Sequence, residues 1–266
     1  MTLPDLGTKD DLANLAWQVE SGADEAISEK PVNRFQVKEE KKPVGGSAAP
    51  GTAKIPAAPA PPVQPPTEAA ISVEKLARGA NTLAELRAAI EAFEGCSLKK
   101  TAMNTVFSRG DAASGLMLVG EAPGADEDRQ GKPFVGASGQ LLDKMMAAIG
   151  RQKDKDYYIS NILPWRPPGN RKPTPVEQTV CLPFIKRHIE LAAPKVLVLL
   201  GGTAVTALLE ITEGITRVRG RWHTYAAGKI TIPAMATFHP AYLLRQPQLK
   251  RQVWHDLLEI KTKLDG

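Results

Sequence analysis

Four short apolar runs, each followed by turn-forming or polar residues, recur between positions 115 and 237. They are residues 115–119, 157–161, 195–200 and 230–237. Each run has the length and the bounding residues of a buried β-strand. We therefore expect four strands, each of which ends in a loop with turn chemistry.

Segments with helical spacing of their apolar residues lie between and after these runs. Residues 138–149 form the first, and a second begins at Thr174 and stops before Pro194, with a capping box between Thr174 and Glu177. Further helices are expected over residues 203–210 and 249–264. Alternating strands and helices favour right-handed crossovers. The predicted fold is α/β, a three-layer α/β/α sandwich with a central four-stranded parallel sheet.

Polar and glycine residues follow directly after the predicted strands. Residues 120–128 read Gly-Glu-Ala-Pro-Gly-Ala-Asp-Glu-Asp, Asn161 ends the second run, Gly201 and Gly202 follow the third, and His239 follows the fourth. In an open parallel sheet, ligands bind beyond the carboxyl ends of the strands. These residues therefore predict one ligand site at one edge of the sheet.

Composition divides the chain unevenly. Of the 24 residues from 43 to 66, 17 are Pro, Ala or Gly, so we interpret residues 36–72 as a disordered linker. Residues 1–35 precede it and contain an amphipathic helical pattern, which either docks on the main domain or binds a protein partner. Residues 73–266 form the expected main domain.

Charge and cysteine content narrow the class of protein. The formal net charge is +5, and the first 70 residues carry 7 Lys or Arg against 10 Asp or Glu, so the positive charge lies in the remainder. A basic domain suits a polyanionic partner, although a solvated basic surface is the alternative. We find no targeting or membrane-spanning segment and expect a cytoplasmic protein. Two cysteines argue against a disulfide scaffold.

Several motifs occur in a recognisable order. They are the loop at 120–128, Gly-Lys-Pro-Phe-Val-Gly at 131–136, Asn161, Arg-Pro-Pro-Gly-Asn-Arg at 166–171, and His-Pro-Ala-Tyr-Leu-Leu-Arg at 239–245. With this order and spacing, the chain resembles family 4 uracil-DNA glycosylases from about Leu86 to Leu264. The resemblance implies a monofunctional enzyme of base-excision repair that hydrolyses the N-glycosidic bond of uracil in DNA. Its partners would be uracil-containing DNA and the product uracil.

The resemblance also implies how the base is held. A uracil inside a duplex cannot be reached, so its nucleotide must be flipped into a pocket. Phe134 would stack on the base, Asn161 would read its polar edge, and Ala122 and His239 would complete the uracil-binding set. Taken singly, Phe134 could be a core aromatic residue and Asn161 a turn-forming strand end. Their shared place at the sheet edge favours the pocket.

Bond cleavage places negative charge on the base and positive charge on the sugar. We expect His239 to donate a hydrogen bond to the base and Glu121 to orient or activate water, with Asp126 and Glu127 as further catalytic acids. Alternatively, some of these acids cap a helix or pair with Arg129. Structural roles are expected for the other three histidines, His188 and His255 in helical patterns and His223 in a loop.

DNA contacts are expected around the last motif and the Pro-rich loop. Leu243, Leu244 and Arg245 are candidates to enter the base stack where the flipped nucleotide was. Arg166 and Arg171 are candidates to contact phosphates.

The chain departs from the family pattern at its metal ligands. The family holds a 4Fe–4S cluster with four cysteines, and here Cys96 and Cys181 match the first and fourth, while Lys99 and Trp165 stand at the other two places. We therefore predict no metal and no cofactor, with Trp165 filling the space and both cysteines acting as small buried residues.

Three alternatives to this enzyme can be compared. A crosslinking branch of the superfamily carries an inserted loop with a nucleophilic His, which residues 169–174 lack, so we expect hydrolytic turnover. A non-catalytic DNA-binding or polymerase-associated module on the same fold would not need Glu121, Asn161 and His239 together. A nucleotide-binding protein would need a phosphate-binding glycine loop, and neither common motif is present.

Overall fold

The computed structural model describes residues 68–266, with side chains described from residue 73. The interpretations of residues 1–35 and of most of the linker lie outside the described residues. Helix α2 (Glu68–Gly79) begins ahead of residue 73, where composition placed the domain boundary. Residues 68–72, which composition assigned to the linker, are thus part of a helix.

A six-stranded sheet forms the centre of the domain, with the strand order β1-β3-β2-β4-β6-β5. The four inner strands are parallel, which confirms the predicted parallel sheet, and each edge carries one further antiparallel strand. These two edge strands were not predicted from the sequence. The strands are β1 (Arg109–Gly110), β2 (Leu116–Gly120), β3 (Tyr158–Asn161), β4 (Val196–Leu200), β5 (Trp222–Ala227) and β6 (Ile230–Thr237).

The missed strand β5 forms a hairpin with β6 and pairs with it from Trp222 to Ala227. Its turn contains Gly228, whose φ of 59° suits a tight hairpin connection. Tyr225 and Ala227 are buried while Thr224 and Ala226 are exposed, which is the alternation of a half-buried edge strand. His223, which we expected in a loop, lies in this strand.

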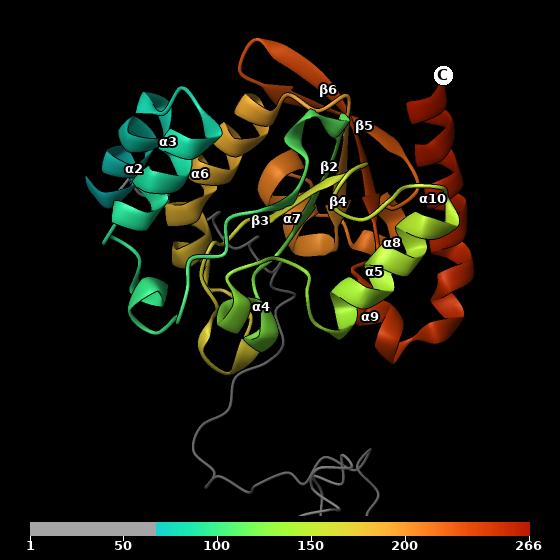
Figure 1. Cartoon of the computed structure of the whole chain (residues 1–266), viewed down its shortest axis with the longest axis horizontal. Coiled ribbons are helices and arrows are strands. Elements are labelled where there is room, and N and C mark those ends of the chain that lie inside the picture. The colour runs from blue at the N-terminus through green and yellow to red at the C-terminus, as the bar shows by residue number, and fades with distance from the viewer. Residues whose placement is uncertain (1–67) are drawn as a thin grey trace, which may run out of the picture. The chain divides into compact units, whose positions relative to one another are not determined.

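Helices cover both faces of the sheet (Figure 1). Alternate residues of β2 point to opposite faces, since Met117 packs with one hydrophobic cluster and Leu118 with the other. The first face packs against α2, α3 (Leu83–Ala92), α6 (Pro175–Ala192) and α7 (Gly202–Leu209). The second packs against α5 (Ala137–Ala148), α9 (Pro240–Arg245) and α10 (Lys250–Asp265). This arrangement confirms the three-layer sandwich.

Four of these helices match the predicted ones, namely α5, α6, α7 and α10. The hydrogen bonds of the capping box at the start of α6 are present, because Glu177 and Thr174 each accept the backbone N–H of the other. Two short helices, α4 (Ala125–Gln130) and α8 (Ile215–Val218), lie in the connections after β2 and β4. Among residues 68–266, no helix combines the length and apolar character needed to cross a bilayer.

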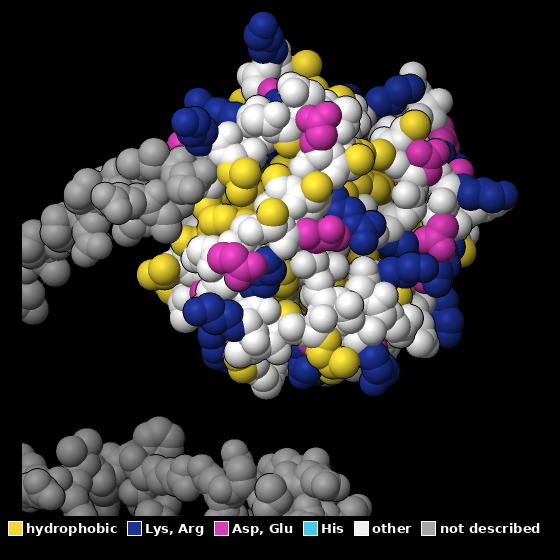
Figure 2. Space-filling view, turned by 60° about the vertical axis from the view of Figure 1, so that its left-hand side comes forward, with side chains coloured by type: hydrophobic (Ala, Val, Ile, Leu, Met, Phe, Trp, Pro, Cys, Tyr) yellow, Lys and Arg dark blue, Asp and Glu magenta, His cyan; other side chains and the backbone are white. Residues whose placement is uncertain are grey.

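The surface over α2, α3 and α6 is turned toward the viewer in Figure 2. Lys and Arg side chains there are interspersed with Asp and Glu, and hydrophobic side chains show between them. The charge on this face is mixed, as on an ordinary solvated surface. The positions of individual cations around the ligand site therefore say more about function than the net charge does.

A buried ion pair ties the edge strand β1 to helix α5. The guanidinium of Arg109 donates two hydrogen bonds to Asp143, with Nη2 to Oδ1 at 2.6 Å and Nη1 to Oδ2 at 3.1 Å. Tyr157 donates its hydroxyl to the same carboxylate at 2.8 Å. A buried charge is tolerated only when it is paired and hydrogen-bonded, so the carboxylate of Asp143 depends on Arg109.

Replacing Arg109 with Met should therefore lower the free energy of unfolding by about 3 kcal/mol, because the partly buried Asp143 loses its main partner. The matched control is Arg129→Met, which removes an exposed ion pair with Asp126 and should cost less than about 1 kcal/mol. Urea titration followed by circular dichroism measures both. Equal losses in the two variants would contradict this account of the ion pair.

Candidate active site

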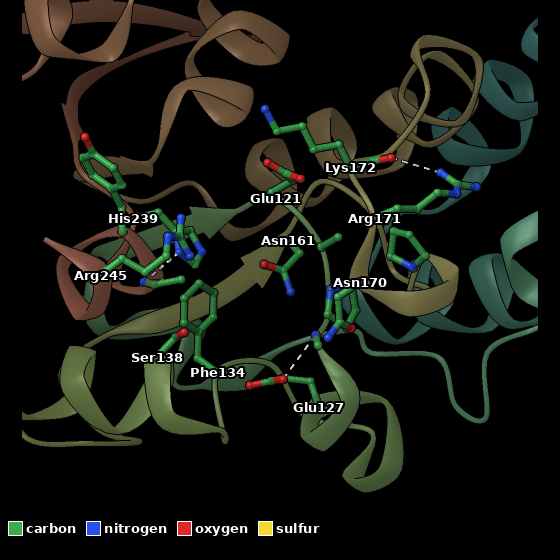
Figure 3. A pocket seen from close by; sticks show the side chains of 16 residues that line it. Glu121, Glu127, Phe134, Ser138, Asn161, Asn170, Arg171, Lys172, His239 and Arg245 are labelled. Carbon is green, nitrogen blue, oxygen red and sulfur yellow. Dashed lines mark hydrogen bonds between the residues drawn. The ribbon is translucent and has the colours of Figure 1, made fainter. Parts of the chain in front are cut away.

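A cavity of about 510 Å³ lies at the carboxyl ends of the parallel strands. Its walls come from the segment after β2, from the end of β3 with the Pro-rich loop that follows it, and from the segment after β6. Figure 3 shows that the labelled side chains come from these separate segments and surround one space. The predicted ligand edge is thus a real cavity. Of the predicted site residues, it brings together Glu121, Ala122, Glu127, Phe134, Asn161, Arg171, His239 and Arg245.

Close packing holds Phe134 in the cavity wall. Its backbone has a φ of 54°, in the left-handed region that is uncommon for a bulky residue. A Cβ at Gly139 would lie 1.8 Å from its carbonyl oxygen, and a Cβ at Gly120 would lie 2.6 Å from the edge of its ring. Glycine is thus required at both positions for the ring to stand where it does. Strain of this kind persists where a functional site demands it.

Asn161 ends β3 and is buried beside that ring. Its side-chain oxygen Oδ1 has no hydrogen-bond partner within the part of the chain that the structure describes. An unsatisfied buried acceptor costs about 1–3 kcal/mol, and such groups are rare in native structures. Because Asn161 also lines the cavity, its oxygen is placed to accept a hydrogen bond from a ligand.

His239 is held in one orientation at the start of α9. Its Nδ1 accepts the backbone N–H of Ala241 at 3.1 Å, so a neutral ring carries its proton on Nε2. Burial, together with the positive charge of Arg245, lowers the pKa of His239 to about 4. The ring lies against Phe134, with the centroids 5.5 Å apart. At neutral pH the site therefore offers an uncharged N–H donor beside the stacking surface.

Glu121 is the first residue after β2, and its side chain is partly buried in the cavity wall. Thr203 donates its hydroxyl to Oε2 of Glu121 at 2.5 Å. Sequence reasoning placed Glu121 correctly at the sheet edge but missed Thr203. A carboxylate held next to a cavity can orient a water molecule or stabilise a positive charge.

The other two predicted catalytic acids make contacts of a different kind. Glu127 accepts the backbone N–H groups of Gly124, Val135 and Gly136 at 3.1, 3.0 and 2.9 Å, so its carboxylate holds two loops together. Asp126 pairs with Arg129 and does not line the cavity. These contacts fit the alternative of capping and ion pairing. A catalytic role for either acid stays a prediction.

The residues of the last motif, 239–245, differ in exposure because most of them lie on helix α9. Leu243 is fully buried against the sheet, so the expectation that it enters the base stack is wrong. Leu244 is 45% exposed and remains a candidate, while the neighbouring Tyr242 is 36% exposed and lines the cavity. Arg245 lines the cavity with its guanidinium 5.9 Å from the centre of the Tyr242 ring.

The Pro-rich loop carries the remaining cations. Arg171 donates two hydrogen bonds to Glu177, at 2.6 and 2.9 Å, and this partner lowers the pKa of Glu177 to about 2. The positive charge of Arg171 is therefore largely balanced by Glu177. Arg166 donates to Asn170 Oδ1 at 2.7 Å and is not part of the cavity wall. Lys172, which sequence reasoning missed, lines the cavity, and its place next to Arg171 was the available signal.

The residues at the family's cluster position do not form a four-cysteine site. Cys96 and Cys181 are buried, with their sulfur atoms 4.0 Å apart. Lys99 donates from Nζ to the backbone oxygen of Glu91 at 2.6 Å, and the buried Trp165 donates from Nε1 to Thr105 at 3.0 Å. Within residues 73–266, no cluster of three or more His, Cys, Asp or Glu side chains could hold a metal ion.

Comparison with known proteins shows which family this chain resembles. A sequence model of the Uracil DNA glycosylase superfamily matches residues 107–258. The Type-4 uracil-DNA glycosylase of Archaeoglobus fulgidus is 41% identical over 170 residues, which are 62% of this chain and 84% of that protein. The Type-4 enzyme of Thermotoga maritima is 40% identical and covers 63% of this chain and 86% of its own. The DNA polymerase of Bacillus phage SP01 is 28% identical over 64% of this chain and 18% of the polymerase.

The protonation of His239 can be measured directly. We expect NMR titration of its ring to give a pKa of about 4, against about 6.5 for an unperturbed histidine. Folding thus favours the neutral ring, and its contribution to stability is lost as the pH falls from about 6.5 toward 4. Replacing Arg245 with Met should raise the pKa, since one repelling charge is gone. A wild-type pKa near 6.5 would contradict a neutral donor held by burial.

Proposed function

The chain belongs to the uracil DNA glycosylase superfamily, and we propose that it is a uracil-DNA glycosylase that leaves an abasic site and so initiates base-excision repair. The observation that carries the proposal is the buried, unpaired Oδ1 of Asn161, which shares one cavity with the N–H donor of His239 and with Phe134. The activity of the Type-4 relatives supports it.

Base selection follows from the donors and acceptors of the pocket. Uracil carries an N–H at position 3 and carbonyl oxygens on either side of it, so it can donate to Asn161 Oδ1. Cytosine has an acceptor at position 3, so in the same pose its N3 could not donate to that oxygen. A buried polar group without a partner gives strong discrimination between similar substrates. Phe134 supplies the stacking surface, and Ala122 forms part of the wall.

The reaction needs charge stabilisation on both sides of the bond. The bond between C1′ of the sugar and N1 of uracil breaks, and its electron pair stays on the base as negative charge. We place the Nε2–H of His239 as the donor to that anion. Glu121 stabilises the positive sugar and orients the water whose hydroxyl adds to C1′, while the water proton passes to the carboxylate or to solvent.

DNA would approach across the mouth of the cavity. Arg245 and Lys172 line it from two sides and are placed to contact phosphates next to the flipped nucleotide. Leu244 is exposed on the short helix α9 and is our candidate for the side chain that fills the vacated place in the base stack. The predicted roles of Arg166 and Arg171 in phosphate binding remain predictions, and their contacts to Asn170 and Glu177 argue for a role in shaping the loop.

We also propose that the protein holds no iron-sulfur cluster. A 4Fe–4S cluster needs four ligands, commonly cysteine thiolates. Only Cys96 and Cys181 stand at the family positions, and the side chains of Lys99 and Trp165 are engaged elsewhere. No step of the proposed reaction requires a metal.

A second function is suggested by one finding, the match to part of a phage DNA polymerase. A non-catalytic module attached to replication proteins would keep the fold and the DNA-binding surface. It would not need an orphaned acceptor, a neutral N–H donor and a carboxylate around one cavity. The activity assay separates the two functions.

Purified wild type should release uracil from a uracil-containing oligonucleotide, measured as strand cleavage after alkali treatment. His239→Ala should lower the single-turnover rate by about 10²–10³ because one preorganised donor is lost. Glu121→Gln should lower it by at least about 10². The matched controls are His255→Ala and Glu259→Gln on the exposed side of α10, which should act like wild type. An inactive wild type on single-stranded and duplex substrates would overturn the proposed function.

The absence of a cluster is tested on protein purified without oxygen. We expect no visible absorption band and less than about 0.1 iron atoms per chain, since two thiolates cannot supply the four ligands. Iron is measured by mass spectrometry, with the double variant Cys96→Ser, Cys181→Ser as the matched control. Stoichiometric iron that disappears in the double variant would show that the cluster is present.

A further inference from the structure

We propose that Thr203 is a positioning residue for the catalytic carboxylate of Glu121. The inference rests on the proposed glycosylase function and assigns a role to the first turn of helix α7, which follows β4. The hydroxyl of Thr203 donates to Oε2 of Glu121 at 2.5 Å, although 82 positions separate the two residues in the chain. Within residues 73–266, no other hydrogen bond is made to this carboxylate.

The sheet explains why these two residues meet. Strands β2 and β4 are parallel neighbours, with Val119 paired to Leu199. Glu121 follows the end of β2 and Thr203 follows the end of β4, so both stand at the same edge. The contact is thus produced by the register of two adjacent strands.

The backbone just before Thr203 is hydrogen-bonded to the end of β6, the strand that leads to His239. Gly201 has a φ of 94° and donates its N–H to the backbone oxygen of Thr237 at 2.9 Å, near the end of β6. A Cβ at Gly201 would lie 3.2 Å from the Cβ of His239. Gly201 therefore lies close to His239, while Thr203, two residues later in α7, contacts Glu121. Because its backbone is held by β6, the hydroxyl of Thr203 is a fixed reference point for Glu121.

The hydroxyl is not required by the helix that carries it. Gly201 is the N-cap of α7, and Thr203 lies inside the helix. Thr203 also does not line the cavity, so it has no direct contact with a bound base. A hydrogen bond to a carboxylate is among the stronger ones in proteins. Its role is best explained as holding one oxygen of Glu121, which leaves the other to act on water or the sugar.

The test compares Thr203→Val, which keeps the shape and removes the hydroxyl, with Thr203→Ser, which keeps the hydroxyl. Thr203→Val should lower the single-turnover rate of uracil release about 10- to 100-fold, with no change in the affinity for uracil-containing DNA. Thr203→Ser should restore the rate to within about threefold of wild type. The matched control is Thr206→Val in the same helix, whose hydroxyl donates to Ile211 and should not matter for the rate.

A double-mutant cycle separates positioning from a general structural effect. In the Glu121→Gln background, Thr203→Val should cost less than about twofold, because the group that it positions is already impaired. The same fold loss in both backgrounds would overturn the inference, as would a Thr203→Val rate within twofold of wild type. If Thr203→Val does not fold by circular dichroism, Thr203→Ala takes its place in the cycle. An inactive wild type overturns the proposed function and this inference together, whereas an active wild type with an equally active Thr203→Val overturns the inference alone.

Discussion

The register of the four parallel strands is the constraint on which the site depends. Gly120 pairs with Asn161 across β2 and β3, and Leu200 pairs with Thr237 across β4 and β6. Since these paired strands end at nearly the same level, their following residues emerge together. A shift of one residue in any strand would turn its side chains to the opposite face and separate the groups that must act on one substrate. The apolar interior of the sheet thus fixes the chemistry at its edge.

Close backbone packing refines what the register makes possible. The stacking ring of Phe134 stands in a left-handed backbone, and the space beside it exists because Gly120 and Gly139 carry no side chain. Glu127 gathers three backbone N–H groups from the two ends of the same connection. The site is therefore built before a ligand arrives, which lowers the entropy that binding must overcome.

Sequence reasoning identified the parts of the fold that local patterns determine. The four parallel strands and helices α5, α6, α7 and α10 follow from apolar runs and capping residues, while the amphipathic edge strand β5 was missed because its alternation is short and includes His223. In the site, the motif 239–245 was found, but which of Leu243 and Leu244 faces solvent depends on how α9 packs. The contact between Thr203 and Glu121 joins residues that are far apart in the chain, so no local sequence pattern predicts it.

Aromatic packing joins three separate segments of the chain around Cys96. The ring of Phe93 lies 6.5 Å from Trp165 and 5.4 Å from Phe184, which joins the segment before Cys96 to the start of the Pro-rich loop and to α6. Trp165 is itself buried and hydrogen-bonded to Thr105. Buried aromatic contacts contribute through both apolar area and ring geometry. Because Lys172 follows in this loop and lines the cavity, the aromatic contacts position one wall of the active site as well as stabilising the fold.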